Sequence, residues 1–410
     1  MIKSVRGTRD LLPPETALWN FVEAAVRDVF RVHNFHEIRT PIIENLQLFQ
    51  RSVGEETDIV SKEMFAWEDR ARAESEKGQM LALRPENTAG VVRAYIEHKL
   101  WERPGLQRLF YIGPQFRRER PQKGRYRQFY QIGAEVIGPP TAGSESPAVD
   151  AEVLEMLATL LDRVGISGWT LQLNSVGCEH DRAVYNEALR KALAGVIDTM
   201  CDDCKRRYQT NPLRVLDCKV PADQPIIEKL PKMLDYLDDD CRVHFEKVQE
   251  LLRAVGVPFE INPRMVRGLD YYRKTAFEFT HGALGAQNAI LGGGRYDGLS
   301  ETLGGPPAPG IGFAIGEDRL ILSLQEGGKG AAPQGRDVYI AWMGDKAYAT
   351  AVRAAKILRD ASFSVELPPT EQKFGKALER ASKLGARYAL ILGENEVNSG
   401  EWTLKTLADG

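Results

Sequence analysis

Residues 116–129, Phe-Arg-Arg-Glu-Arg-Pro-Gln-Lys-Gly-Arg-Tyr-Arg-Gln-Phe, carry the densest set of side chains suited to phosphate chemistry. Six of them are basic and one is acidic. The segments on both sides are typical of strands, so the stretch is expected to form a hairpin with a long, positively charged loop. Guanidinium groups pair bidentately with phosphate oxygens, and an aromatic face can stack on a base. The pattern favours a site for a nucleoside triphosphate over a merely solvated surface hairpin.

Further motifs, taken in their order along the chain, point to one family. The hairpin resembles motif 2 of class II aminoacyl-tRNA synthetases, and the whole set is similar to the histidyl-tRNA synthetase family over almost the entire chain. The other segments that carry the resemblance are residues 6–10, residues 40–44 at the end of motif 1, residues 83–88 in the amino-acid-binding loop, residues 267–272, residues 292–297, and residues 312–319 in motif 3. Their common order and spacing are more specific than any one motif alone.

Two positions depart from the family's pattern. Asn87 stands where glycine is usual, and Asp318 stands where glutamate is usual. Both departures keep the neighbouring carboxylates and the arginine that the chemistry needs. Asparagine adopts a positive φ more readily than most residues, so Asn87 is expected to replace glycine in a turn.

The resemblance implies a pocket for the amino acid histidine. The residues implied are Glu86, Thr88, Gln131, Glu135, Tyr271, Tyr272 and Tyr296. Glu86, helped by Thr88, would bind the α-ammonium group. Glu135 and Tyr272 would meet the two imidazole nitrogens, because a carboxylate accepts from a ring N–H and a phenol can serve the other nitrogen. Each of these residues alone would more often be structural, so the prediction rests on the set.

The same resemblance implies how ATP is bound and activated. The residues implied are Arg117 and Arg267 at the α-phosphate, Arg125 and Arg319 at the β- and γ-phosphates, and Glu119 and Phe129 at the adenine. Arg117 and Arg267 would be the catalytic pair as the histidine carboxylate attacks. That carboxylate is ionised near pH 7, so positioning and electrostatic stabilisation suffice without a general base. Mg²⁺ is expected to accompany ATP rather than to occupy a protein cage.

Transfer of histidine to the 3′ end of tRNA(His) is implied as the second step. The loop residues Arg120, Gln122 and Lys123 are assigned to the acceptor stem, although charges at a loop tip are often only solvated. The C-terminal part resembles the anticodon-binding domain of several class II enzymes. Its basic residues on or near one predicted helix are Lys373, Lys376, Arg380, Lys383 and Arg387.

The five cysteines include one C-x-x-C pair, Cys201 and Cys204, with Cys218 further along. Structural zinc requires four ligands in a tetrahedral array. Because the sequence contains neither a second C-x-x-C pair nor an H-x₃-H pair, no metal site is expected. Residues 201–219 instead resemble the family's insertion domain, which packs over the acceptor stem.

Hydrophobic periodicity predicts the elements that must position these residues. Helices are expected over residues 14–33 and 147–164, and strands over residues 108–112, 128–138, 170–173, 276–280 and 310–315. These strands do not alternate regularly with helices, which favours a mixed, mostly antiparallel sheet flanked by helices. The expected fold class is α+β, with the antiparallel-sheet catalytic core of class II synthetases, a helical insertion, and a C-terminal α/β anticodon-binding domain.

Shifts in composition suggest the domain limits. The catalytic domain is expected over residues 1–326, with a charged helical insertion at about 178–240. A glycine-rich linker is expected at residues 327–335. An α/β domain with a largely parallel sheet follows over residues 336–410, since strands at 337–342, 364–367 and 388–392 alternate with helices at 347–361 and 374–384. The resemblance also implies a homodimer, because motif 1 builds the dimer interface in this class.

The composition excludes several classes of protein. The 410-residue chain is 43% hydrophobic and 27% charged, close to the globular average. No apolar run suits a transmembrane helix, and the N-terminus lacks the apolar core of a signal peptide. An odd, sparse set of cysteines argues for a reducing compartment, so a cytoplasmic protein with no membrane partner is expected. With a net charge of −3, any RNA partner would need local basic patches.

Two alternative functions are weighed against this one. The first is the non-catalytic regulatory paralogue that assists ATP phosphoribosyltransferase in histidine biosynthesis, which shares the core but typically lacks the anticodon domain and several motif residues. The second is another class II synthetase of the same subgroup, such as the threonyl, prolyl or glycyl enzyme. Arg117, Arg267 and Arg319 argue against the first, and residues 267–272 argue against the second.

Overall fold

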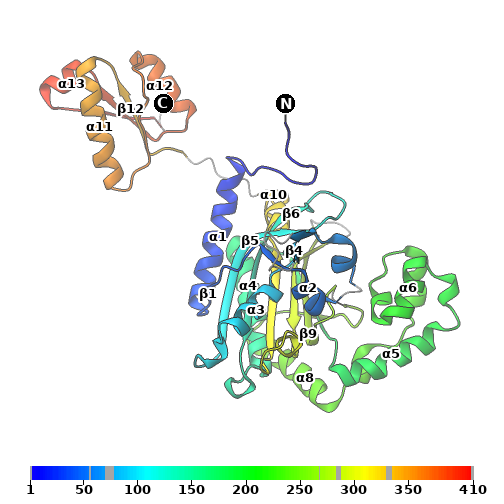
Figure 1. Cartoon of the computed structure of the whole chain (residues 1–410). Helices are drawn as coiled ribbons and strands as arrows, with labels where there is room; N and C mark the ends of the chain where they lie inside the picture. Colours follow the sequence, from blue (N-terminus) through cyan, green and yellow to red (C-terminus); the bar gives the residue numbers. More distant parts are fainter. Residues whose placement is uncertain are drawn as a thin grey trace. The chain divides into compact units, whose positions relative to one another are not determined.

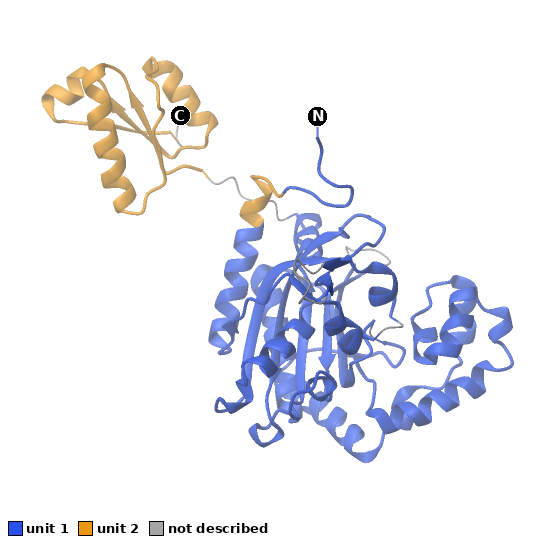
Figure 2. Cartoon of the chain, viewed as in Figure 1, with its two compact units in different colours: residues 1–10, 19–330 blue, residues 11–18, 331–410 orange. Residues whose placement is uncertain are grey.

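The structure is a computed structural model that describes residues 2–54, 57–69, 78–266, 268–282, 288–328 and 335–407. The chain divides into two compact units, which are residues 1–10 with 19–330, and residues 11–18 with 331–410 (Figure 2). The domain limits expected from the sequence stay a prediction. Residues 329–334 of the expected linker lie outside the described residues.

An eight-stranded sheet forms the centre of the larger unit, in the order β1-β5-β6-β11-β10-β9-β7-β8 (Figure 1). Its strands are β1 (His36–Glu37), β5 (Gln107–Phe116), β6 (Gln128–Ile137), β7 (Trp169–Ser175), β8 (Glu260–Ile261), β9 (Arg273–His281), β10 (Ala289–Arg295) and β11 (Gly310–Gly316). Only the outer pairs, β1 with β5 and β7 with β8, are parallel among these described strands. The predicted mixed, mostly antiparallel sheet is confirmed.

The larger unit also contains a small sheet and several helices. The small sheet has the order β2-β4-β3, with β2 (Ile43–Asn45), β3 (Ala66–Asp69) and β4 (Gln79–Leu83). The helices outside the insertion are α1 (Glu15–Val32, of which the part from Trp19 belongs to this unit), α2 (Leu46–Val53), η1 (Ile59–Glu63), α3 (Thr88–Glu97), η2 (Leu100–Glu102), η3 (Pro140–Ala142), α4 (Pro147–Val164), α8 (Asp239–Ala254), α9 (Leu299–Thr302) and α10 (Glu317–Glu326). Within the part of the chain that the structure describes, no helix combines the length and apolarity needed to span a membrane.

Helix α4 shows why local sequence signals predict this framework well. Ser146 caps its N-terminus by accepting a hydrogen bond from the backbone of Ala148, and Pro147 occupies the first turn, where its missing N–H costs nothing. The helix ends at Gly165, whose φ of 82° is left-handed. The observed bounds equal the predicted ones. Its buried apolar stripe comprises Val149, Val153, Met156, Leu157, Leu160 and Leu161.

The insertion is helical, as predicted. Residues 178–240, all of which the structure describes, contain no strand. The elements completed within them are α5 (Glu179–Leu193), η4 (Ile197–Thr199), α6 (Asp202–Thr210), η5 (Pro212–Asp217), η6 (Pro221–Asp223), α7 (Gln224–Ile227) and η7 (Met233–Tyr236). The insertion has an apolar core of its own, which includes Tyr185, Leu189, Cys204, Val215 and Cys218.

The smaller unit has the predicted β-α-β-α-β order. Its elements are β12 (Val338–Trp342), α11 (Asp345–Asp360), β13 (Val365–Glu366), α12 (Phe374–Lys383), β14 (Tyr388–Leu392), α13 (Glu394–Ser399) and β15 (Thr403–Thr406). The sheet order is β13-β12-β14-β15. The first three strands in this order are parallel, and β15 joins the edge in the antiparallel sense. The largely parallel sheet expected from the sequence is confirmed.

Candidate active site

One face of the central sheet carries a row of residues that the sequence assigns to ligands. Alternate residues of a strand share a face, and Phe129, Gln131 and Glu135 on β6 stand in this relation. Strand β11 pairs with this row through Gly312 opposite Glu135 and through Gly316 opposite Gln131, with alanine at 314 between them. Because these β11 residues are small, the surface of the sheet has room for polar side chains and for a ligand.

Glycine is required at two of these sheet positions by close packing. A Cβ atom at Gly312 would lie 1.7 Å from Oε2 of Glu135. A Cβ atom at Gly133 would lie 2.3 Å from the hydroxyl oxygen of Tyr111. Both distances are far below van der Waals contact. The two glycines therefore provide the space that the carboxyl group of Glu135 and the phenol of Tyr111 occupy.

A buried polar compartment forms where α3 begins. One oxygen of Glu86 accepts from the backbone N–H of Thr88 (2.8 Å) and the other from that of Ala89 (3.0 Å). The Thr88 hydroxyl donates to Oε1 of Glu135 at 2.7 Å. Both glutamates are buried, and burial raises the pKa of each, to about 8 for Glu135. Glu135 is therefore largely protonated at neutral pH when the compartment holds no ligand.

Three tyrosines complete this compartment. The ring of Tyr271 lies 4.8 Å from that of Tyr272 and 6.1 Å from that of Tyr296, measured between centroids. All three side chains are buried. Burial holds the pKa values of Tyr271 and Tyr296 well above their usual range, so these phenols stay protonated and can donate hydrogen bonds. The structure thus brings the predicted tyrosines together near Glu135.

Gln131 connects the compartment to an open pocket of about 790 Å³. Its side chain is buried, and within the described residues its Oε1 atom has no hydrogen-bond partner, which leaves that acceptor to a ligand. The predicted ATP residues that line the same pocket are Arg117, Glu119, Arg125, Phe129 and Arg319.

Arg117 lines the open pocket and contacts the loop that carries Glu86. Its Nε donates to the carbonyl oxygen of Pro85 at 3.0 Å, and its guanidinium carbon lies 5.1 Å from the centroid of the Phe129 ring. Its positive charge opposes the rise in the pKa of the buried Glu86. Further along the pocket, Arg125 pairs with Glu119 at 3.1 Å. The pocket therefore contains cationic groups directly beside the buried carboxylates.

The remaining predicted residues are Arg267 and three residues of the hairpin loop. Arg267 lies outside the described residues, although Met265 and Val266 before it line the pocket. The loop residues Arg120, Gln122 and Lys123 are exposed. Lys123 pairs with Glu326 at 2.6 Å across the surface.

The explanation offered for Asn87 is wrong. Its φ is −123°, so it does not occupy a left-handed turn in place of glycine. Instead, its Oδ1 accepts from the hydroxyl of Thr40 at 2.6 Å and lies 3.4 Å from a guanidinium nitrogen of Arg84. Asn87 therefore ties the end of motif 1 to the amino-acid-binding loop, which a glycine could not do through a side chain.

Asp318 has a positioning role. One of its oxygens accepts from Arg9 at 3.0 Å, and the other accepts from the backbone N–H of Tyr130 at 2.9 Å. The guanidinium carbon of Arg9 also lies 4.7 Å from the centroid of the Tyr126 ring. Through Asp318, the N-terminal motif is joined to β6 and to the start of α10.

Sequence reasoning missed several residues of the site. Glu63 and Glu278 line the pocket, and Tyr111 is buried close to Glu135. The sequence did contain a signal for Glu278. It is a charged residue between two phenylalanines of strand β9, and it lies opposite Gly292 of the glycine-rich strand β10. Glu63 and Tyr111 had no comparable signal, since only packing brings them here.

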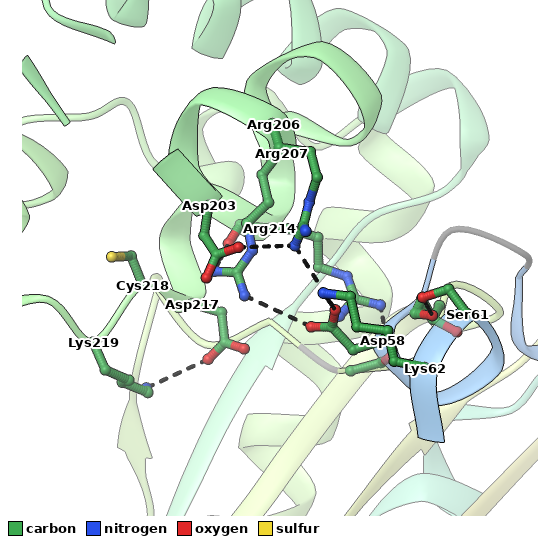
Figure 3. Close-up of polar contacts among 12 residues, drawn as sticks. Asp58, Ser61, Lys62, Asp203, Arg206, Arg207, Arg214, Asp217, Cys218 and Lys219 are labelled. Atoms are coloured by element: carbon green, nitrogen blue, oxygen red, sulfur yellow. Dashed lines mark hydrogen bonds and ion pairs between the residues drawn. The ribbon is translucent and has the colours of Figure 1, made fainter. Parts of the chain in front are cut away.

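The insertion supplies part of the pocket wall, through Arg207, Asp217, Cys218 and Lys219. Figure 3 shows the polar contacts around this wall. Asp58 accepts from Lys62 at 2.9 Å and lies 3.8 Å from Arg206, while Lys219 pairs with Asp217 at 3.4 Å (Figure 3). Residues on α6 of the insertion are therefore linked to η1 of the core by ion pairs.

Comparisons with known proteins agree with this geometry. The family model described as Histidyl-tRNA synthetase matches residues 7–320, and the one described as Anticodon binding domain matches residues 337–410. A histidine–tRNA ligase of Koribacter versatilis is 67% identical over the whole chain and 93% of the relative. One of Solibacter usitatus is 57% identical over the whole chain and 95% of the relative. The apo histidyl-tRNA synthetase of S. aureus is similar in structure, with a TM-score of 0.82 at 36% identity over the whole chain and 96% of that chain.

Proposed function

Because the chain belongs to the histidyl-tRNA synthetase family, we propose that it activates histidine with ATP to histidyl-adenylate and then transfers histidine to the 3′ end of tRNA(His). The observation that carries this function is the arginine-lined pocket that opens beside a buried compartment with two carboxyl groups and three tyrosines. The match of both a synthetase core and an anticodon-binding domain favours the enzyme over the regulatory paralogue.

The buried compartment is the proposed site for histidine. Glu86, held by two backbone N–H groups, binds the α-ammonium group, with Thr88 beside it. Glu135 and Tyr272 bind the imidazole nitrogens, with Gln131, Tyr271 and Tyr296 around them. A site of paired polar groups rejects analogues that leave a buried group unpaired, at about 1–3 kcal/mol for each group.

The open pocket is the proposed site for ATP. Arg117 stabilises the α-phosphate from one side, and Arg267 is proposed for the other side on its place in the family motif. The arginines Arg125 and Arg319 bind the outer phosphates, and Glu119 and Phe129 contact the adenine. Mg²⁺ would enter with ATP and neutralise phosphate charge. The residues of the chain contribute position and fixed charge, which suffices because the histidine carboxylate is already a nucleophile.

The tRNA is proposed to meet the chain at two places. The exposed residues Arg120, Gln122 and Lys123 lie in the loop of the hairpin and would contact the acceptor stem. In the smaller unit, Lys376 and Arg380 are exposed on α12 and would contact the anticodon stem. Local clusters of this kind can bind phosphates even though the chain as a whole is slightly acidic. The proposed compartment is the cytoplasm, where the tRNA is charged.

A homodimer is proposed through the small sheet that follows motif 1. Four large apolar side chains on or next to its strands are exposed by 38–50%: Ile42, Ile43, Trp67 and Met80. By the register of the small sheet, Ile43 and Trp67 lie on one face and Met80 lies on the other. Exposed apolar side chains that share a face, such as Ile43 and Trp67, are typical of an interface with another protein. Pro41 of motif 1 precedes them directly, so a second copy of the chain is the proposed partner.

ATP–pyrophosphate exchange, measured with each amino acid in turn and without tRNA, tests the function. Exchange that depends on histidine alone is the expected result. Folded protein that supports no exchange with any amino acid would point instead to the regulatory paralogue. Exchange with threonine, proline or glycine would contradict the assignment of the pocket.

A further inference from the structure

We propose that the insertion holds a structural zinc ion, coordinated by Cys201, Cys204, Cys218 and Asp223. Their ligand atoms, three sulfurs and one carboxylate oxygen, all lie within 4.8 Å of one another. No metal site was expected from the sequence, because only thiol and imidazole ligands were considered. The fold supplies the fourth ligand as a carboxylate. This proposal does not depend on the enzymatic function.

The spacing of the ligand atoms fits a tetrahedral ion. Zinc–sulfur bonds of about 2.3 Å at tetrahedral angles place two sulfurs about 3.8 Å apart. The sulfurs of Cys201 and Cys218 are 3.8 Å apart. Oδ2 of Asp223 lies 3.3 Å from the Cys218 sulfur, near the separation of about 3.6 Å that a zinc–oxygen bond of ordinary length would give. Only small adjustments would admit the ion.

The surrounding backbone already directs N–H groups at these ligands. The N–H of Cys201 donates to Oδ2 of Asp223 at 3.2 Å. The N–H of Val220 donates to the sulfur of Cys218 at 3.4 Å. Hydrogen bonds of this kind orient metal ligands and stabilise the negative charge on thiolates.

The burial of three of the four proposed ligands is hard to explain if all four are only uncharged residues of the core. The exposed fractions of Cys204, Cys218 and Asp223 are 0%, 5% and 2%. Thiols alone would pack as small apolar groups, but a carboxylate among them has a high desolvation cost.

A second cluster of the insertion provides a contrast. Cys178, Asp181, Asp238 and Cys241 also lie within 4.8 Å of one another. Here the carboxylates cap two helices, since Asp181 accepts from the backbone of Cys178 at 3.1 Å and Asp238 accepts from that of Cys241 at 2.7 Å. This cluster offers two sulfurs rather than three, and Asp181 also accepts from the backbone N–H of Asp238 at 2.9 Å, so hydrogen bonds at the helix starts account for it without an ion. The second cluster therefore serves as a matched control.

The position of the proposed site gives it a structural consequence. Its ligands come from the start of α6, the end of η5 and η6, so an ion would cross-link short segments that little regular structure holds together. Cys218 lies between Asp217 and Lys219 in the wall of the open pocket. Four protein ligands close the coordination shell, as in structural rather than catalytic zinc sites.

Metal analysis of the untagged full chain, produced with zinc in the medium and dialysed, tests the proposal. We expect about one zinc ion per chain in the wild type. Cys204→Ser and Asp223→Ala should lose most of this zinc, while Cys241→Ser in the capping cluster should keep it. A wild-type protein without zinc, or equal loss in the Cys241→Ser variant, would overturn the proposal.

Cobalt substitution decides the case if the variants fail to fold. Wild-type chain that is loaded with Co²⁺ should show the ligand-field bands of a tetrahedral ion and a sulfur-to-cobalt charge-transfer band. Thiol titration of the metal-free, denatured chain should find all five cysteines reduced. A spectrum without sulfur ligation contradicts the site, and so does a loss of two thiols to a disulfide.

Discussion

At the scale of single residues, the chemistry of the site depends on two carboxyl groups in different surroundings. Burial raises the pKa of Glu86, but two backbone N–H groups and the positive charge of Arg117 oppose this rise. Glu135 accepts from the Thr88 hydroxyl, and burial together with the nearby charge of Glu86 raises its pKa to about 8. The first suits a permanent cation such as the ammonium group, and the second suits a ligand that exchanges a proton.

Glu135→Gln tests the imidazole assignment. The variant keeps an acceptor but loses the charge, so the KM for histidine in pyrophosphate exchange should rise roughly 10- to 100-fold. In the wild type, KM should fall as pH rises through about 8, because the accepting carboxylate then predominates. The titration of free histidine affects the wild type and the variant equally, so it cancels when the two pH profiles are compared. Equal pH profiles for the wild type and the variant would exclude Glu135 as the proton-linked group.

Gly312→Ala tests the space that the sheet provides for this carboxyl group. The new Cβ would lie 1.7 Å from Oε2 of Glu135, so the carboxyl group must move and histidine activation should drop at least tenfold. Gly195→Ala, where a Cβ meets nothing within 4 Å, is the control and should retain full exchange. Unchanged activity in the Gly312→Ala variant would mean that the position of Glu135 does not matter.

Glu317→Gln tests a buried carboxyl group outside the pocket. Glu317 is fully buried, its oxygens have no hydrogen-bond partner within the described residues, and its pKa is raised by burial to about 9. The folded chain therefore holds a proton that the unfolded chain releases from about pH 4.5 upwards. Its contribution to stability is present below that pH and is lost as pH rises through about 9.

The glutamine variant should therefore be more stable than the wild type at pH 9, by roughly 2 kcal/mol or more, with a smaller gain at pH 6. Urea denaturation at both pH values measures this difference. Glu246→Gln, at an exposed position of α8, should show neither effect. Destabilisation of the Glu317→Gln variant at pH 9 would contradict the assigned protonation state.

At the scale of elements, a buried ionic network joins the helices behind the sheet to its strands. Asp150 of α4 accepts from Arg295 of β10 at 2.5 Å, from Thr275 of β9 at 2.6 Å and, with suitable protonation, from His244 of α8 at 2.8 Å. Both Asp150 and Arg295 are fully buried. Tyr296 of the histidine compartment follows Arg295 directly, so this network holds the end of β10 in place.

Asp150→Ala should destabilise the chain by up to about 3–5 kcal/mol, because it removes one of the two carboxylates, Asp150 and Asp297, that pair with the buried guanidinium of Arg295. The double variant Asp150→Leu with Arg295→Met removes both charges and should cost less than Asp150→Ala alone. Denaturation in urea measures both. A double variant at least as unstable as Asp150→Ala would show that shape, not charge, dominates here.

At the scale of the whole molecule, the proposed homodimer predicts the mass of the particle in solution. Sedimentation equilibrium should give about twice the chain mass of 45.8 kDa. Trp67→Asp should shift the mass towards the monomer and reduce histidine activation, since it places a charge in the proposed interface. Val243→Asp, at an exposed apolar position on α8, should do neither. A monomer that retains full activity would contradict the proposed dimer.

Local signals predicted the framework and several residues that line the open pocket. The bounds of α4 follow from a cap, a proline and a glycine, all adjacent in sequence. The hairpin residues Arg117, Arg125 and Phe129 were found from charge and motif order, and they do line one pocket. Such features depend on neighbours along the chain, so sequence alone is enough to predict them.

Tertiary structure alone decided which distant groups meet. Asp150 and Arg295 lie 145 residues apart in sequence, and no local pattern relates them. The same holds for Asn87 with Thr40, and for Asp223 with the backbone N–H of Cys201, 22 residues away. Side-chain contacts of this kind depend on how layers pack, because burial sets both the pKa of a carboxyl group and the partners left to it.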